Sequence, residues 1–296
     1  MLLSELGEFG LLAELEARGL AHGIADDAAL FHGGLVVTQD LLLEAVHFRL
    51  EWTSWRDLGY KAAAVNLSDL AAMGARPVAL LVMLTLPPDL ELAALLELYA
   101  GLNEPGFPVV GGDTNAAADV SVAVTAVGYS ERVPGRGGAR PGDALVVTGP
   151  LGGAAAGLRA LERGVGGFDE LVALHRRPPY RLDAGAALAP KADAMIDVSD
   201  GIGADAARIA ERSGCRLVVD VDALPLADRL EEVGDEPFWT MGEDYELLAA
   251  LAPKDAKESG FAVVGRCESG EGVELRSGSR VLSAAGWDHF IRRGAS

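Results

Sequence analysis

Between Asn66 and Ala75 the chain reads NLSDLAAMGA, a segment that carries one carboxylate in apolar surroundings. It completes a stretch from Trp55 to Met73 whose apolar residues recur at helical spacing, which predicts a helix. Asp69 lies between Leu67 and Leu70, where a charge is costly unless it is paired or bound to a metal. A satisfied buried aspartate and a metal ligand are both open interpretations at this point.

Strands and helices alternate on both sides of this helix. Strands are predicted at 35–39, 78–86, 107–111 and 120–129, and again at 144–148, 194–198, 216–221, 247–251, 261–264 and 273–275; further helices are predicted at 90–102, 154–163, 180–188 and 204–213. The stretch VPGRGGARPGD at 133–143 is rich in Gly, Pro and Arg, as domain junctions often are. The sequence therefore predicts a mixed α/β (α+β) protein with two domains, 1–135 and 136–296.

Composition excludes several classes of function. The formal charge of −19 argues against nucleic acid as a partner, because no basic stripe is present to replace phosphate counterions. The longest apolar run, Val78–Leu86, is far shorter than the ~20 residues that span a bilayer. The acidic N-terminal stretch predicts an amphipathic helix and lacks the basic start of a signal peptide. Cys215 and Cys267 are too few for a disulfide framework or a zinc site, so a cytoplasmic location is expected.

Acidic residues gather in five segments, at expected strand ends or beside glycines. These are GIADDAAL (23–30), VTQDLLLEAVHF (37–48), NLSDLAAMGA (66–75), VVGGDTN (109–115) and MIDVSDGIGAD (195–205). Magnesium prefers a few carboxylates together with waters and substrate phosphates, so single aspartates that converge from several elements would suit it. Taken alone, each of these residues is also an ordinary turn or cap residue.

The glycine-rich turn GPLGGAAAGL at 149–158 leads from a predicted strand into a predicted helix. It matches neither a dinucleotide-binding loop nor a Walker A loop, and no nucleophile elbow, zinc-protease or protein-kinase motif occurs in the chain. Close packing of the helix on the strand and phosphate binding both remain open. If the protein uses ATP, it does so without a P-loop.

Taken together and in this order, the segments resemble the thiamine-monophosphate kinase family. NLSDLAAMGA, GGDT, DVSDG and GEDYEL (242–247) carry the resemblance, which extends from GEFGLL at 7–12 to GWDHF at 286–290. The family belongs to an ATP-binding superfamily that includes aminoimidazole ribonucleotide synthetase and selenophosphate synthetase. The resemblance implies an N-terminal α/β domain that pairs with its twin in a homodimer, and a C-terminal domain that closes over the nucleotide. It also implies phosphorylation of thiamine monophosphate by ATP with several Mg²⁺ ions.

The resemblance carries roles to individual positions. It implies metal ligands at Asp27, Thr38, Gln39, Asp40, Asp69, Asp113, Asp197 and Asp200, with Asp40, Asp69, Asp113 and Asp197 as the catalytic set; nucleotide contacts at Gly112, Asp113, Arg136 and Ser199; and a thiamine-phosphate pocket at His47, Glu243 and Trp287. His47 is open to a second interpretation as a core histidine. The sequence departs from the family pattern at Ala25 and Ala45, where Gly is usual, and at Gln39, where Ser or Thr is usual. Gln39 is expected either to turn away from the metal or to shift it.

The chemistry of the implied reaction accounts for the acidity of the site. ATP and thiamine monophosphate bring roughly six negative charges together, and their repulsion at close range is large. An acidic pocket can accept them only through bridging Mg²⁺ ions. The attacking phosphate oxygen is already anionic, so no strong general base is needed. Two alternatives remain open: another ATP-using enzyme of the superfamily, similar to aminoimidazole ribonucleotide synthetase or selenophosphate synthetase, and a non-catalytic nucleotide- or metal-binding relative.

Overall fold

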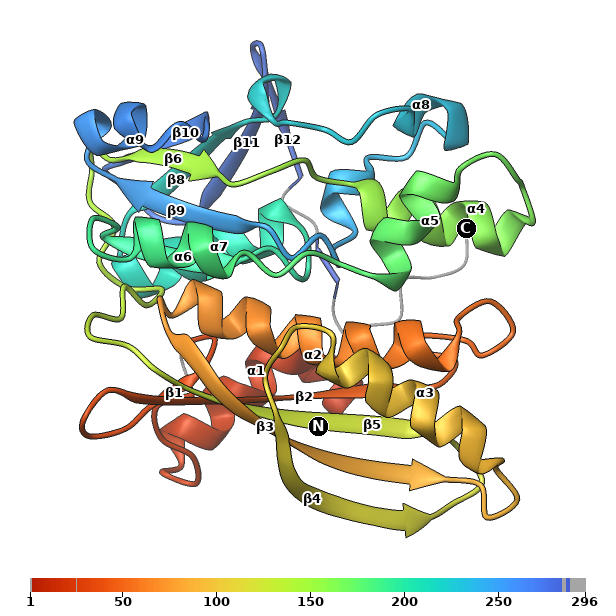
Figure 1. Ribbon diagram of the computed structural model, residues 1–296. Helices are drawn as coiled ribbons and strands as arrows, with labels where there is room; N and C mark the ends of the chain where they lie inside the picture. The colour runs from red at the N-terminus through yellow and green to blue at the C-terminus, as the bar shows by residue number, and fades with distance from the viewer. Residues whose placement is uncertain (1, 25, 284–285, 288–296) are drawn as a thin grey trace.

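The computed structural model describes residues 2–24, 26–283 and 286–287, and its strands form two sheets (Figure 1). The first sheet has the order β1-β2-β5-β3-β4. Its strands are β1 (Ala29–Leu30), β2 (Leu35–Leu43), β3 (Arg76–Leu86), β4 (Val109–Ala116) and β5 (Ser121–Tyr129). Neighbouring strands are antiparallel except β3 and β4, which are parallel. β2 and β4 are longer than the sequence predicts, because β2 pairs along the whole of β5 and β4 pairs with residues Leu80–Leu86 of β3.

The second sheet has the order β12-β11-β8-β10-β6-β9-β7. Its strands are β6 (Ala144–Val147), β7 (Ala194–Asp197), β8 (Arg216–Asp220), β9 (Leu247–Leu251), β10 (Ala262–Glu268), β11 (Val273–Ser277) and β12 (Arg280–Leu282). α7 (Ile202–Ser213) packs on one face, while α6 (Leu182–Leu188) and α9 (Pro253–Ser259) pack on the other. The remaining helices are α1 (Leu3–Ala17), α4 (Gly153–Arg163), α5 (Asp169–Arg176) and α8 (Leu230–Val233), with short 3₁₀ turns at Val221–Ala223 and Phe238–Thr240. The mixed α/β class predicted from the sequence is confirmed.

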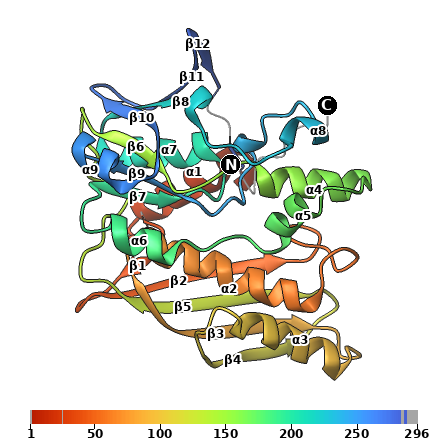
Figure 2. The ribbon, with the colours of Figure 1, turned by 45° about the horizontal axis from the view of Figure 1, so that its top comes forward.

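The helix α2 (Trp55–Ala72) lies between the two sheets and contacts both (Figures 1 and 2). Ser54 caps its first turn by accepting a hydrogen bond from the Asp57 amide at 3.1 Å. α3 (Leu92–Asn103) packs against α2 so closely that only a glycine fits at position 59. A Cβ on Gly59 would meet the Leu98 carbonyl at 1.9 Å. α2 is buried around most of its circumference, as expected for a helix enclosed by two layers.

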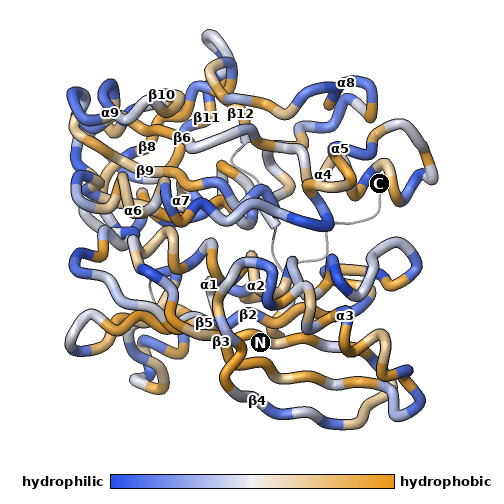
Figure 3. Tube along the Cα trace, in the orientation of Figure 1, coloured by the Kyte–Doolittle hydropathy of each residue, from blue (hydrophilic) through white to orange (hydrophobic). Residues whose placement is uncertain are grey.

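The two faces of the first sheet differ. Residues with even numbers in β2, and in β3 from Leu80 onward, are turned toward α2, and Val36, Leu42 and Leu80 among them are buried. Alternate residues point to the opposite face. That face carries Leu41, Leu43, Leu81 and Met83, each 38–49 % exposed, and the hydropathy colouring shows the apolar character of these strands (Figure 3). We call it the open face.

The chain division expected at 135/136 stays a prediction; the first sheet ends at Tyr129 and the second begins at Ala144. Over the described ranges, no helix combines the length and the apolar character needed to cross a membrane.

Candidate functional site

A cavity of about 580 Å³ lies where α2 and the first sheet meet the second half of the chain. Most of the residues expected from the sequence to form the site line it: Asp27, Thr38, Gln39, Asp40, His47, Asp69, Arg136, Asp197, Ser199, Asp200, Glu243 and Trp287. Gly112 and Asp113 are not among its lining residues. The cavity therefore joins segments from both ends of the described chain, from Glu8 to Trp287.

Three carboxylates form the centre of the cavity. Asp27 precedes β1, Asp69 belongs to α2, and Asp197 ends β7; oxygens of all three lie within 4.8 Å of one another. Thr38 donates a hydrogen bond to Asp69 at 2.5 Å, and Ser68 donates one to Asp197 at 2.7 Å. Asp27 Oδ2 is buried and has no hydrogen-bond partner among the described residues. An all-oxygen donor set with an unsatisfied oxygen fits a hard divalent cation such as Mg²⁺.

Burial and mutual repulsion raise the pKa values of this cluster. Removal from water is the largest cause in each case. It raises the pKa of Asp197 to about 8 and that of Asp40 to about 6, and it raises the pKa of Asp69 well above its ordinary value. Without a cation, Asp197 therefore keeps its proton near neutral pH.

Arginines balance part of this negative charge. Arg136 Nη2 lies 2.6 Å from Asp27 Oδ1, and Arg208 pairs with both Asp200 and Asp205. The Trp287 amide donates a hydrogen bond to the Asp200 carbonyl at 3.0 Å, which places Trp287 at the rim of the cavity. Arg136, expected to contact nucleotide, is thus within reach of an anion but engaged with Asp27.

The GEDYEL segment, which also lines the cavity, holds Glu243 in an uncommon backbone conformation. Gly242, Glu243 and Tyr245 have φ of 85°, 62° and 51°, a region that residues with side chains adopt rarely. The Glu243 amide donates to the Ser199 carbonyl at 2.7 Å, which ties this loop to the DVSDG segment. The carboxylate of Glu243 is therefore held in place by its main chain as well as by its neighbours.

Two residues of this region were not predicted from the sequence. Lys61 on α2 lies 2.8 Å from Glu243, and His175 on α5 lies 3.0 Å from it. Lys61 had a detectable signal, since it is a single cation within the apolar stretch of the helix. His175 had none, because α5 itself was not predicted.

Strand alternation separates two expected metal ligands from the carboxylate cluster. Thr38 and Asp40 point toward α2, so the side chain of Gln39 between them points to the open face. Asp113 pairs in register with Met83, which is also on the open face. Within one chain the sheet itself lies between these two side chains and the cluster. Residue 39 still contributes to the cavity lining, and its expected relation to a bound metal stays a prediction.

The glycine turn at 149–158 packs closely, and Ala155 and Leu158 from it line the cavity. The Asp244 carboxylate accepts hydrogen bonds from the Gly152 amide at 2.9 and 2.8 Å, at the start of α4. A Cβ on Gly157 would meet the Leu171 carbonyl at 2.1 Å. Close packing of the turn is therefore present, with the Asp244 carboxylate at the helix N-terminus, and phosphate binding by this segment stays a prediction.

Of the departures from the family pattern, Ala45 has a clear structural setting. It has a φ of 64°, in the tight turn between β2 and His47 where its amide donates to the Phe48 carbonyl. A glycine would adopt this conformation without strain. Ala25 lies outside the described residues, as do residues 288–290 of GWDHF.

Comparison with known families identifies the class of protein that this fold and site represent. Residues 25–130 match the family model for the AIR synthase related protein, N-terminal domain, and residues 140–276 match that for its C-terminal domain. The chain therefore belongs to the AIR synthase related proteins.

Within that class, its relatives are thiamine-monophosphate kinases. It is 36 % identical to the thiamine-monophosphate kinase of Aquifex aeolicus, over 98 % of this chain and all of that protein. It is 39 % identical to that of Mycobacterium tuberculosis, over 97 % of this chain and 93 % of that protein. A solved structure of AaThiL complexed with AMPPCP and TMP covers 98 % of this chain and 99 % of that chain, with 34 % identity and a TM-score of 0.89. The chain is a member of the thiamine-monophosphate kinase family.

Proposed function

We propose that the protein transfers the γ-phosphoryl group of ATP directly to the phosphate of thiamine monophosphate, which gives thiamine diphosphate. The buried cluster of Asp27, Asp69 and Asp197 is the observation that carries this proposal. Three buried carboxylates so close together do not stabilise a fold, because each negative charge raises the free-energy cost of ionising the other two. They are of use where a polyphosphate must be bound through cations.

Mg²⁺ bound at the cluster would neutralise charge on the phosphates and on the transferred group. The metal would be held by Asp27, Asp69 and Asp197, with Asp40 and Asp200 next to these three ligands. Thr38 would orient Asp69 through the hydrogen bond between them. Arg136 and Ser199, which line the same cavity, would contact the nucleotide. The chain's contribution to the rate is then the fixed alignment of two anions, which is the main source of catalysis in phosphoryl transfer.

The acceptor would lie toward Glu243, His47 and Trp287. Thiamine monophosphate carries a positive thiazolium ring, and the ionised carboxylate of Glu243 offers it a counter-charge. Trp287, 47 % exposed and in the cavity lining, carries an aromatic ring, a group whose face attracts cations. These groups would set the distance from the acceptor phosphate to the cluster.

A homodimer and a cytoplasmic location are part of the same proposal. The open face is an apolar sheet surface, and such a surface is usually covered by a partner. Covering it with a second copy would bring Gln39 and Asp113 to the interface, the only setting in which Asp113 could act as a metal ligand. Both cysteines are free and buried, which fits a reducing compartment.

The decisive experiment is to mix the protein with ATP, Mg²⁺ and thiamine monophosphate and to measure thiamine diphosphate by chromatography. Asp69→Asn should retain the fold and lower the rate by about 10²-fold or more, since it removes charge from the cluster. Asp89→Asn, an exposed aspartate in the turn after β3, is the matched control and should be fully active. Binding of ATP without any thiamine diphosphate would instead favour the non-catalytic relative.

A further inference from the structure

Lys61 is a fully buried cation that the proposed chemistry does not use. Its side chain is 1 % exposed. Its ammonium group donates to Glu243 Oε1 at 2.8 Å and to the His47 carbonyl at 3.1 Å. A buried ammonium is costly unless both charge and hydrogen bonds are satisfied. Here the two groups that satisfy it are both in the cavity lining and come from segments 196 positions apart in the sequence, at residues 47 and 243.

The second oxygen of Glu243 faces His175 Nδ1 at 3.0 Å. Burial by itself would raise the pKa of Glu243, but the Lys61 charge and His175 outweigh it and hold that pKa well below its ordinary value. Burial, with the Lys61 charge second, lowers the pKa of His175, so a neutral imidazole faces the carboxylate near pH 7. Glu243 is thus kept as an anion in one orientation while 24 % of its side chain remains exposed to the cavity.

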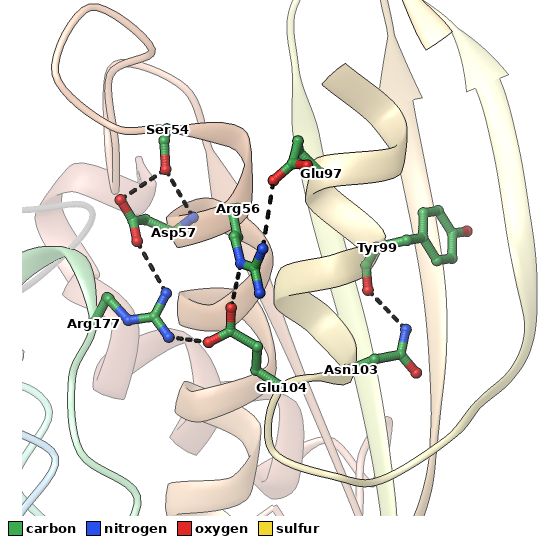
Figure 4. Close-up of polar contacts among 8 residues, drawn as sticks. All are labelled: Ser54, Arg56, Asp57, Glu97, Tyr99, Asn103, Glu104 and Arg177. Carbon is green, nitrogen blue, oxygen red and sulfur yellow. Dashed lines mark hydrogen bonds and ion pairs between the residues drawn. The ribbon is translucent and has the colours of Figure 1, made fainter. Parts of the chain in front are cut away.

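A second set of contacts fixes the helix that carries His175. Arg177, just after α5, pairs with Asp57 on α2 and with Glu104 after α3 (Figure 4). Its guanidinium also stacks on the Tyr60 ring, 3.9 Å from the centroid. α5 is therefore docked on the same helix that carries Lys61, so His175 and Lys61 reach Glu243 from one rigid unit.

We propose that Lys61 is a positioning residue for the acceptor: it joins the His47 turn of the first half to the Glu243 carboxylate of the second half, and so sets the width and charge of the acceptor pocket. This inference rests on the proposed function. It predicts that Lys61 governs recognition of thiamine monophosphate and leaves recognition of ATP to the carboxylate cluster. A purely structural ion pair would affect both substrates, or stability alone.

The test compares Lys61→Met, Glu243→Gln and the double variant, with KM measured separately for each substrate. Lys61→Met should raise KM for thiamine monophosphate by about tenfold or more, the size of a lost charge-assisted hydrogen bond, and change KM for ATP less than about twofold. The double variant should be no worse than Glu243→Gln alone, because Lys61 acts through Glu243. Lys254→Met is the matched control: it removes an exposed lysine ammonium from α9 and should leave both KM values unchanged.

Equal rises in both KM values, or full additivity in the double variant, would overturn the proposal. Lys61→Gln, which keeps a donor without the charge, is used if Lys61→Met does not fold; it should raise KM for the acceptor by a smaller factor, and an unchanged KM would also overturn the proposal. Titration of thiamine monophosphate into the Mg²⁺–ATP-analogue complex of each variant gives the same comparison without turnover. A parent protein that binds both substrates but makes no product would count against the proposed reaction and leave the Lys61 comparison intact.

Discussion

Ala45 shows how one departure from the family pattern affects the molecule at the scale of a residue. It holds a left-handed backbone conformation that costs residues with a Cβ about 1–2 kcal/mol. The turn it forms places His47, whose Nδ1 accepts a hydrogen bond from the Leu43 amide at 3.0 Å. The chain therefore tolerates strain at this position to keep the turn.

Ala45→Gly should raise the free energy of unfolding by roughly 1 kcal/mol, because it removes that strain. Ala116→Gly, at an exposed position in β4, is the control and should lower it by roughly 0.5–1 kcal/mol. Urea unfolding of the three proteins measures both changes. Loss of stability in Ala45→Gly would show that the backbone there is not strained.

Asp197 should make stability depend on pH in the metal-free protein. Its pKa is about 8 in the folded state, against an ordinary value of 3.8. The folded state thus keeps a proton that the unfolded state releases, so the free energy of unfolding should fall as pH rises from about 4 to about 8. Saturating Mg²⁺ should remove most of this decline, since bound metal displaces the proton.

Unfolding of the parent and of Asp197→Asn at about pH 5, 6.5 and 8 tests this. The general charge repulsion in a chain with a charge of −19 is almost the same in both proteins. The difference between the two slopes of unfolding free energy against pH therefore measures the contribution of the Asp197 carboxyl group. Equal slopes would contradict the prediction.

At the scale of an element, α4 and α5 form a pair whose spacing is set by Gly157. Gly157→Ala should destabilise the protein by about 1–3 kcal/mol, since the new methyl group would overlap the Leu171 carbonyl. Because α5 carries His175, KM for thiamine monophosphate should rise as well. Gly166→Ala, where nothing lies within 4 Å of the added Cβ, should change neither quantity. Thermal unfolding and the two KM values supply the measurements.

Elements were predictable from the sequence to the extent that their periodicity was strong. The helix α2, which contains Asp69, and the buried strand β3, which contains Leu84, were predicted from the sequence, because their apolar spacing is sufficient to indicate them. The short α5 was missed, since eight residues with a mixed pattern gain their helicity from packing on α4 and α2. β2 was cut short at Gln39, and only its pairing with β5 shows that Asp40 lies within the strand.

The candidate site was predictable as a set of residue types and not as a geometry. Family likeness placed Asp27, Asp69 and Asp197 together, and the cavity contains them. It did not show that Asp113 faces the other side of the sheet, because strand register depends on partners far away in the chain. Nor did it point to Lys61, whose role arises only where two halves of the molecule meet.

At the scale of the whole molecule, the open face should control assembly. Met83→Glu places a charge at the centre of an apolar surface and should convert the proposed homodimer into monomers at micromolar concentration. Asp89→Glu, in the nearby turn, should leave assembly unchanged. Sedimentation equilibrium distinguishes the two states. A parent protein that sediments as a monomer would refute the dimer and, with it, any metal-binding role for Asp113.

The burial of Lys61 also gives the molecule a built-in chemical reporter. The chain has four lysines, and the other three, Lys191, Lys254 and Lys257, are exposed. An amine-reactive label should modify those three at once and reach Lys61 only when the two halves separate. The rate of acylation at Lys61, followed by mass spectrometry, would therefore measure how often the two halves of the enzyme separate. This acylation rate should fall when both substrates are bound and hold the halves together.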